Sequence, residues 1–407
     1  MPSDALQQDD PPDRRGVGRH AQAAEGAPAR ELFARRSRAE HADGEGTMTE
    51  QLRFDGRVAI VTGAGIGIGA AHARYLAGRG AAVVVNELPA NLHRAEAVRD
   101  EIRAEGGVAI AVGGRIGDDA DARALVATTI EEFGRVDIVI HNAGVPAGRV
   151  MDGSELVPRA PEAGMDLYFD INVRGSLQLN RAAWPHMTEQ GYGRILFTSS
   201  AVGTGFWYGP TGYELDYAVS KLGVFAAARQ VSAAGAEHGI IANTLMPWAF
   251  SETVGASGGG AETDLITFMR KTLQPEKVAA AIAPLLHEDA PTSGEAFTVG
   301  GGRIARVFIA GTRGYFNPDL TSEDVMANWD QIMGGTEPVR NAAGYLRTEP
   351  APRGAALLQG PRTRSHTRPE VDRRAVGEGV HAVGRQLSNR RTTSSTSDPR
   401  TLRSNHG

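Results

Sequence analysis

Three tyrosines and one lysine stand close together in the segment GFWYGPTGYELDYAVSKLG, and one tyrosine is a candidate acid–base group. The tyrosines are Tyr208, Tyr213 and Tyr217, and the lysine is Lys221. A tyrosine exchanges protons near neutral pH only if its pKa falls from about 10, and a nearby ammonium favours the phenolate. At about 4 Å and an effective dielectric near 20, that attraction is on the order of 4 kcal/mol, or roughly three pKa units. Residues i and i+4 share a helix face, and only Tyr217 has a lysine at that spacing.

A glycine-rich loop indicates a second kind of site, one that binds phosphate groups. The segment TGAGIGIG follows an apolar run and precedes a helix-like stretch, with glycines at Gly63, Gly67 and Gly69 in G-x-x-x-G-x-G spacing. Glycine lets backbone N–H groups approach a diphosphate at a helix N-terminus. Glu87 ends the next apolar run, where an acid bonds a ribose 2′-hydroxyl and repels a 2′-phosphate. No Arg or Lys occupies the loop, so the sequence predicts an NAD site rather than an NADP site.

The elements that must position these groups are short β-branched runs separated by longer segments with helical spacing. The runs cover residues 57–62, 81–87, 108–112, 136–141, 193–200, 240–246 and 295–301. Continuous apolar runs are typical of parallel strands that are covered on both faces. The sequence therefore predicts an α/β fold with one doubly wound, Rossmann-like domain over residues 48–345. We expect a parallel sheet of about seven strands with helices on both faces.

Together these features resemble the short-chain dehydrogenase/reductase family over about residues 54–310. The glycine pattern, HNAG at 141–144 and the pair Tyr217 and Lys221 match its ordered motifs. The resemblance implies that Tyr217 exchanges the substrate hydroxyl proton while Ser200 polarises the carbonyl oxygen. It also implies that Lys221 lowers the pKa of the tyrosine and bonds the nicotinamide ribose, and that Asn172 supports a proton relay. Acid–base help of this kind accelerates a reaction roughly a hundred- to ten-thousand-fold.

The loop, the acid and the resemblance together predict a set of NAD-binding residues. They are Gly63, Gly65, Ile66, Gly67, Ile68, Gly69, Glu87, Ile116, Asn142, Ala143, Gly144, Tyr217, Lys221, Pro247, Ser251 and Thr253. The sequence departs from the family pattern at His141, which replaces an Asn and is predicted to be structural, and at Trp248, which replaces a Gly. Arg115 stands where the family has an adenine-contacting Asp. The gap between Ser200 and the catalytic tyrosine is long, so a displaced Tyr213 that reaches the substrate is an alternative.

Aromatic residues flank the expected nicotinamide position and indicate the kind of substrate. The predicted substrate-lining residues are Phe206, Trp207, Tyr208, Tyr213, Trp248 and Phe250. Aromatic walls favour a bulky apolar alcohol or ketone, although these side chains could instead pack a lid and the core. The stretch from Gln274 onward resembles the dehydrogenase domain of multifunctional β-oxidation enzymes, which implies a 3-hydroxyacyl-CoA; a hydroxysteroid or cyclic alcohol stays an equal option.

The predicted function is therefore that of an NAD-dependent oxidoreductase that interconverts a secondary alcohol and a ketone. The alternative is a non-catalytic dinucleotide-binding protein that uses the same fold for regulation or assembly. The intact set of Tyr217, Lys221, Ser200 and Asn172 argues against that alternative, because a pure binder has no need of all four. By resemblance we also expect a homodimer or homotetramer.

The ends of the chain differ in composition from the middle. Residues 1–47 have no apolar run, and residues 346–407 form an Arg-rich tail, so both are expected to be disordered. From residue 347 onward there are twelve Arg and five acids, or about +7, whereas the whole chain carries −5. The middle is therefore acidic, which argues against a nucleic-acid partner. Met48 directly precedes the segment TEQLRFDGRVAIVTGAG, which contains the first predicted strand, and is a candidate start.

Other compositional features exclude further classes of function. The chain has no cysteine, so a disulfide framework and a Cys-based zinc site are excluded, and no metal cluster is expected. No apolar stretch is long enough for a membrane span and no signal peptide is visible. We expect a cytoplasmic protein without a membrane partner.

Overall fold

The computed structural model describes residues 29–31, 33, 51–145, 162–205, 215–250 and 264–334. The chain divides into two compact units, Met1–Ile309 and Ala310–Gly407. This boundary lies inside the predicted 48–345 domain, whose limits therefore stay a prediction. The predicted extensions fall almost entirely outside the described residues.

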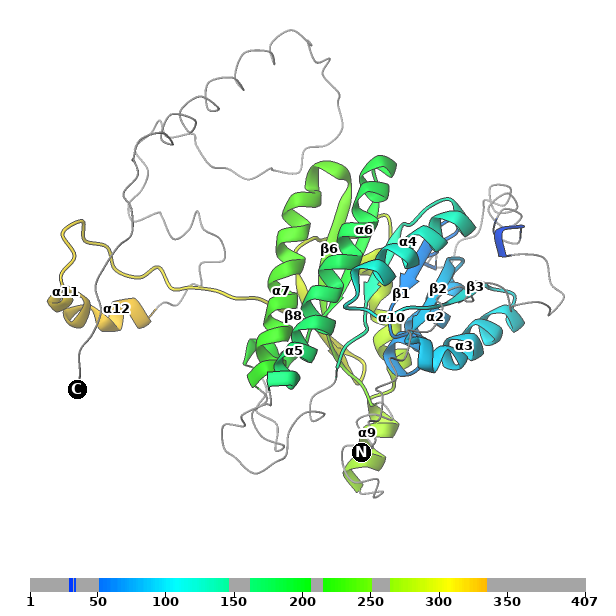
Figure 1. Cartoon of the computed structure of the whole chain (residues 1–407). Helices are drawn as coiled ribbons and strands as arrows, with labels where there is room; N and C mark the ends of the chain where they lie inside the picture. The colour runs from blue at the N-terminus through cyan, green and yellow to red at the C-terminus, as the bar shows by residue number, and fades with distance from the viewer. Residues whose placement is uncertain are drawn as a thin grey trace, which may run out of the picture. The chain divides into compact units, whose positions relative to one another are not determined.

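An eight-stranded sheet forms the centre of the first unit (Figure 1). Its strands follow the order β3-β2-β1-β4-β5-β6-β7-β8, and all neighbours are parallel except β7 and β8. Their bounds are β1 Val58–Val61, β2 Ala82–Glu87, β3 Val108–Gly113, β4 Ile138–His141, β5 Gly193–Thr198, β6 Ile240–Trp248, β7 Ala296–Gly300 and β8 Arg303–Val307. The predicted parallel sheet of about seven strands is confirmed.

The antiparallel strand β8 was not predicted, and a two-glycine turn explains it. Gly301 and Gly302 join β7 to β8 with φ angles of 58° and 84°. A two-residue hairpin turn with both residues in the left-handed region matches the twist of the flanking strands, and glycine adopts it without strain. The Gly-Gly pair was therefore a hairpin signal in the sequence.

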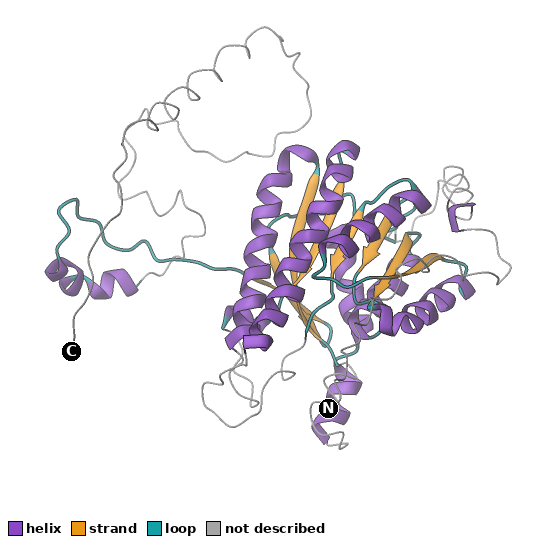
Figure 2. Cartoon of the chain, viewed as in Figure 1, coloured by secondary structure: helices purple, strands orange, loops and turns teal. Residues whose placement is uncertain are grey.

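Helices cover both faces of the sheet (Figure 2). One face packs against α2 (Gly67–Gly78), α3 (Leu92–Ala104) and α10 (Pro275–Leu286), and the other against α4 (Asp119–Phe133), α6 (Gly175–Gln190) and α7 (Leu215–Gly235). Successive residues of β1 belong to opposite cores, with Ala59 and Val61 in one and Val58 and Ile60 in the other. This alternation explains why each residue of the strand is apolar.

The remaining elements of the first unit lie along the chain between the strands. They are α5 (Glu162–Tyr168), a π-helix (Phe169–Arg174) and α9 (Asp264–Thr272), with short 3₁₀ turns at Pro89–Asn91, Ala201–Thr204 and Ala236–His238. The strand order reverses between β1 and β4, since β1 pairs with both β2 and β4. In doubly wound sheets ligands bind at the carboxyl ends of the strands beside such a reversal. The glycine loop follows β1 and the HNAG motif includes the end of β4, so both lie at this point.

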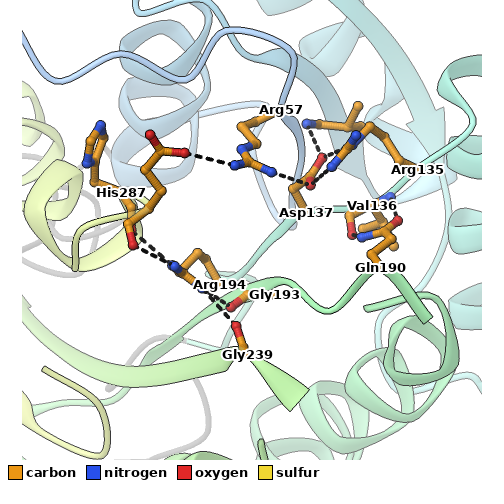
Figure 3. Close-up of polar contacts among 11 residues, drawn as sticks. Arg57, Arg135, Val136, Asp137, Gln190, Gly193, Arg194, Gly239 and His287 are labelled. Carbon is orange, nitrogen blue, oxygen red and sulfur yellow. Dashed lines mark hydrogen bonds and ion pairs between the residues drawn. The ribbon is translucent and has the colours of Figure 1, made fainter. Parts of the chain in front are cut away.

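Charged side chains join the amino ends of the central strands, opposite the end that carries the glycine loop (Figure 3). Asp137 is fully buried before β4 and accepts hydrogen bonds from the Val58 amide at 2.9 Å and from Arg135 at 2.7 and 2.6 Å. Arg194 on β5 donates to the carbonyl oxygens of Gly193, Gly239, His287 and Glu288 at 2.8–3.0 Å. These bonds provide partners for charged groups that are buried where the strands begin. The glycine loop lies at the other end of the strands.

A short helical turn near the N-terminus packs on α4. Ala29 is buried, the Phe33 and Phe133 ring centroids are 5.6 Å apart, and the Arg30 amide donates to Glu132 at 3.2 Å. At these residues the structure differs from the expectation for the extension 1–47, because Phe33 provides an apolar anchor.

The described part of the second unit contains two short helices, α11 (Ser322–Ala327) and α12 (Trp329–Met333). Thr321 and Asp324 form a capping box at the start of α11, and the Thr312 hydroxyl donates to the Ile332 carbonyl at 2.6 Å. None of residues 310–334 is buried. Across the described residues of both units, no helix combines the length and apolarity that a membrane crossing requires.

Two buried histidines are expected to make the protein acid-sensitive. His72 in α2 and His141 at the end of β4 have no hydrogen-bond partner among the described residues, and burial lowers the pKa of both to about 3 from 6.5. Between these values the unfolded chain binds more protons than the folded one, so stability falls as the pH decreases from 6.5 toward 3. We expect a loss of about 2 kcal/mol per histidine in the free energy of unfolding between about pH 7 and about pH 5.

Urea denaturation at the two pH values measures this loss, and the variant His141→Leu should show about half of it. An equal loss in the variant and the original protein would assign the acid sensitivity to other groups.

Candidate functional site

The glycine loop between β1 and α2 is packed so closely that side chains would not fit. Gly63 has a φ of 60°, in the left-handed region, and a Cβ on it would lie 2.9 Å from the Cα of Ala143. A Cβ on Gly69 would lie 2.4 Å from the carbonyl oxygen of Gly63. The helix α2 begins at Gly67 without a side-chain cap, so its first amides point into the loop. Such a cradle suits a diphosphate.

The HNAG motif after β4 holds this loop in place. The Asn142 side chain donates to the carbonyl oxygens of Thr62 and Gly63 at 3.0 and 3.1 Å. The backbone amides of Asn142 and Ala143 donate to the Thr62 hydroxyl at 3.1 and 3.0 Å. The motif therefore fixes the geometry of the loop by hydrogen bonds from a neighbouring strand.

Glu87 stands at the end of β2, on the far side of the loop from the HNAG motif. Its carboxylate accepts from the Gly65 amide at 3.3 Å and from the Leu88 amide at 2.9 Å. These bonds orient the carboxylate and leave it further acceptor positions for ribose hydroxyls. Arg94, which the sequence analysis did not single out, lines the same cavity together with Arg115.

Tyr217 and Lys221 lie in the first two turns of α7, as predicted. The Lys221 ammonium is 5.7 Å from the centroid of the Tyr217 ring and donates to the Thr198 carbonyl at 3.0 Å. Lys221 is 5% exposed, and burial lowers its pKa from 10.5 to about 8. A cation held this close favours the phenolate form of the tyrosine.

The two serines after β5 have different environments. The Ser199 hydroxyl donates to the backbone carbonyl of Lys221 at 2.6 Å, so it anchors α7 to the sheet. The Ser200 hydroxyl oxygen accepts from the Val202 amide at 3.3 Å, and Ser200 lines the cavity. A hydroxyl on the wall of the cavity is placed to donate to a substrate oxygen, and the polarising role of Ser200 stays a prediction.

Asn172 lies in the π-helix that precedes α6. Its side-chain oxygen accepts from the Val145 amide at 3.1 Å, and its side-chain nitrogen donates to the Ser220 hydroxyl at 3.0 Å. The Ser220 hydroxyl in turn donates to the Tyr217 carbonyl at 2.8 Å. A π-helical turn often marks a functional position, and here it presents Asn172 to the helix that carries the tyrosine. Asn172 itself does not line the cavity. Its contacts therefore indicate that it supports the position of α7.

Removing the Ser220 hydroxyl tests this buried chain of hydrogen bonds. Ser220 is fully buried, so Ser220→Ala removes the hydrogen-bond acceptor of the Asn172 side-chain nitrogen. We expect the free energy of unfolding to decrease by about 1 to 3 kcal/mol in urea denaturation. The matched control is Ser232→Ala, whose hydroxyl bonds Ser293 at an exposed position; equal effects in both variants would contradict the assignment.

One cavity of about 830 Å³ joins these groups. Of the predicted residues, those that line it are Gly63, Ile66, Gly67, Ile68, Glu87, Ile116, Asn142, Ala143, Gly144, Ser200, Tyr217, Lys221 and Pro247. Lining residues that the sequence analysis missed include Asn86, Leu88, Asn91, Arg94, Val145, Leu167, Ile171, Thr198, Ser199 and Ala249. Several of them follow a strand end, which was the available signal. Gly65 and Gly69 shape the loop without lining this cavity.

The predicted substrate side of the site is described only in part. Phe206, Trp207, Tyr208, Tyr213, Ser251 and Thr253 lie outside the described residues. Trp248 pairs with Gly300 on β7, where a Cβ would lie 2.4 Å from the Trp248 Cβ. Phe250 lines a second cavity of about 420 Å³ beside the glycine loop. The Cζ atom of Arg270 lies 5.2 Å from the centroid of the Phe250 ring. Neither Trp248 nor Phe250 lines the main cavity.

His141 occupies a structural position, as expected for a lone histidine at the end of a strand. Its ring stacks on Phe197 with centroids 4.6 Å apart, and it is 5% exposed. It lies in the sheet, paired with Phe197 of β5. Because burial also keeps it neutral, we assign it no acid–base role.

Comparison with known proteins identifies a matching family and several similar proteins. The family model described as short chain dehydrogenase matches residues 57–258. The mouse peroxisomal multifunctional enzyme type 2 is 37% identical over 297 residues, which cover 70% of this chain and 38% of that protein. A short-chain type dehydrogenase/reductase of Mycobacterium tuberculosis is 33% identical over 284 residues, 68% of this chain and 93% of its own. This chain thus spans well under half of the mouse relative.

A solved structure with a bound cofactor is also similar. The 7 alpha-hydroxysteroid dehydrogenase complexed with NADH and 7-oxo glycochenodeoxycholic acid has a TM-score of 0.54 at 29% identity, covering 63% of this chain and 98% of that one. One sequence-based expectation is wrong. A cytoplasmic location is contradicted by the mouse relative and by others, which are named peroxisomal enzymes.

Proposed function

The chain belongs to the short-chain dehydrogenase/reductase family and is an oxidoreductase of CH–OH groups, and we propose that it interconverts a secondary alcohol and a ketone with NAD. The observation that carries this proposal is one cavity in which Tyr217, Lys221 and Ser200 share the walls with the glycine loop and Glu87. The groups suited to proton transfer and those suited to binding a dinucleotide therefore face the same space. The non-catalytic alternative is not favoured by the comparisons, because the similar proteins include ones named as dehydrogenases.

The residues of the chain divide the proposed chemistry between them. Bound NAD supplies the hydride acceptor for alcohol oxidation. The Tyr217 phenolate takes the proton of the substrate hydroxyl, while the Ser200 hydroxyl donates to the same oxygen and orients it. The Lys221 ammonium favours the phenolate, while the bond of Ser199 holds α7 at the end of β5 and that of Asn172 holds it to the π-helix. In ketone reduction the Tyr217 hydroxyl returns the proton.

The residues present fit a dinucleotide. A Cβ on Gly63 or Gly69 would clash with neighbouring protein atoms, so glycine is needed for the tight turn that leads into the N-terminus of α2, where backbone amides suit a diphosphate. The oriented carboxylate of Glu87 suits the two hydroxyls of a ribose, and we propose NAD over NADP on this ground. Initial rates with NAD and NADP at equal concentration test the preference, and faster turnover with NADP would contradict it.

For the substrate we favour a 3-hydroxyacyl-CoA. The downstream resemblance to the dehydrogenase domain of β-oxidation enzymes supports it, and so does the identity to a multifunctional enzyme. A hydroxysteroid is the second candidate, supported by the similar structure that holds a 7-oxo steroid. NADH formation by the full chain from each compound decides between them. We expect the larger kcat/KM with the acyl-CoA. Turnover of the steroid alone would favour the second candidate as the substrate, and turnover of neither compound would overturn both candidates.

We also propose a homodimer or homotetramer. Leu215, Val219 and Leu222 share one face of α7 and are 58%, 46% and 40% exposed. An exposed apolar stripe of this kind on a long helix suits a contact with another copy. Light scattering on the purified chain tests the proposal, and a monomeric mass would contradict it.

A further inference from the structure

The ring of Tyr217 packs against a second tyrosine that lies behind the wall of the main cavity. Tyr168 ends α5 and is 2% exposed, and the two ring centroids are 5.7 Å apart in an edge-to-face arrangement at 65°. Tyr168 is not among the described residues that line the cavity. We propose that Tyr168 is a positioning residue whose ring holds the Tyr217 ring in the orientation that proton transfer requires. This inference rests on the proposed function, because Tyr168 acts through the acid–base group assigned there.

Tyr217 occupies the part of α7 that the helix itself stabilises least. It is the third residue of the helix, which begins at Leu215. The first amides of a helix have no partner within it, and helix ends fray. The apolar neighbours of Tyr217 on the helix are little buried, since Leu215 is 58% and Val219 is 46% exposed. A reacting group must be held to within about 0.5 Å of its productive position, so this turn needs a contact from outside the helix.

The segment that carries Tyr168 is attached to α7 over the next two turns. α5 lies beside α7 and continues into the π-helix (Figure 1). From this π-helix Asn172 donates to the Ser220 hydroxyl at 3.0 Å. One residue further, Val173 lies against Gly223, where a Cβ would be 3.4 Å from its side chain. These contacts follow the same order along both segments, so they fix the Tyr168 ring relative to the start of α7.

Two fixed groups therefore lie close to the Tyr217 ring. The Lys221 ammonium and the Tyr168 ring centroid are each 5.7 Å from the Tyr217 ring centroid. Edge-to-face aromatic pairs are stabilised beyond the area that they bury, so rotation of the Tyr217 ring out of this arrangement is disfavoured. A ring that cannot rotate keeps its hydroxyl at a constant distance from the Lys221 ammonium, and this distance determines how strongly the cation favours the phenolate.

Replacing Tyr168 by leucine tests the role of the ring. Leucine keeps an apolar side chain and removes the aromatic edge. We expect kcat of the full chain to fall about tenfold, measured with NAD and either the acyl-CoA or the steroid, whichever the chain oxidises faster. The pH at which the rate of alcohol oxidation increases should move to a higher value, because a mobile phenolate is stabilised less by the Lys221 ammonium. The dissociation constant of NADH should stay unchanged.

Two further variants separate the ring from other contributions. Tyr168→Phe keeps the ring and should keep kcat within about twofold of the original protein. Phe133→Leu is the matched control, because Phe133 forms an edge-to-face pair with Phe33 at 5.6 Å and 70°, on α4 and outside the cavity. It should lose stability but keep kcat and the pH profile. The rates are compared well below the unfolding temperature of every variant, so that unfolded protein does not contribute to a loss.

The outcomes separate this inference from the function it rests on. If Tyr217→Phe were inactive while Tyr168→Leu kept its kcat and pH profile, the positioning role alone would be overturned. Equal losses of kcat in Tyr168→Leu and Phe133→Leu, or in Tyr168→Leu and Tyr168→Phe, would also overturn it. If Tyr217→Phe kept its turnover, the proposed function and this inference would fall together. Tyr168→Met, whose flexible side chain fills more of the ring volume, repeats the test if the leucine variant unfolds.

Discussion

Replacing Tyr217 with phenylalanine is expected to lower kcat by roughly a hundred- to ten-thousand-fold. The change removes only the hydroxyl that exchanges the substrate proton and leaves the ring, which packs against Tyr168 with centroids 5.7 Å apart. The cavity and the glycine loop stay intact, so the dissociation constant of NADH should hardly change. Steady-state kinetics and fluorescence titration of the same preparation measure both quantities.

Tyr75→Phe is the matched control, since that tyrosine lies on α2 beside Arg79 and outside the cavity. It should retain full activity. If Tyr217→Phe kept its turnover while Tyr213→Phe lost it, the acid–base role would belong to Tyr213, the alternative that the long gap after Ser200 raises.

Replacing Lys221 with methionine is expected to cost activity and to increase stability. Over the 5.7 Å between the ammonium and the Tyr217 ring, the attraction at an effective dielectric near 20 is on the order of 3 kcal/mol. Loss of this attraction should lower kcat roughly a hundredfold at neutral pH. The pH at which the rate of alcohol oxidation increases should move to a higher value.

The stability effect has the opposite sign because burial opposes the charge of Lys221. Its pKa is about 8 in the folded protein against 10.5 in the unfolded chain, so the folded state carries the full cost below pH 8 and loses it as the pH rises to 10.5. Lys221→Met should therefore raise the free energy of unfolding at neutral pH by up to about 3 kcal/mol. Lys277→Met, at an exposed position, is the control. A variant that is inactive and also less stable would indicate damage to the fold.

The features that could be predicted from the sequence are those set by local spacing. Tyr217 and Lys221 are separated by one helical turn, and the glycine loop and the apolar strands are continuous stretches, so each carries its own signal. The family resemblance then ordered these signals along the chain. The same reasoning favoured Ser200 over Ser199, and the bond from Ser199 to the Lys221 carbonyl supports that choice.

The features that could not be predicted depend on contacts between distant segments. Arg94 reaches the cavity because α3 packs beside the glycine loop, and the bond between Asn172 and Ser220 joins residues 48 positions apart. The positions of the aromatic residues that were expected to line the substrate site also depend on long-range packing. Trp248 packs against Gly300, and Phe250 lines the second cavity. Composition carried no information on location, and the cytoplasmic expectation was corrected by the relatives.

A crystal structure of the full chain with NADH and a 3-ketoacyl-CoA analogue tests the central claim most directly. The account predicts the ketone oxygen within about 2.6 to 3.2 Å of both the Tyr217 hydroxyl and the Ser200 hydroxyl. It also predicts the nicotinamide in the cavity beside Lys221. A ketone oxygen bonded instead to Tyr213, or held away from Tyr217 and Ser200, would contradict the account.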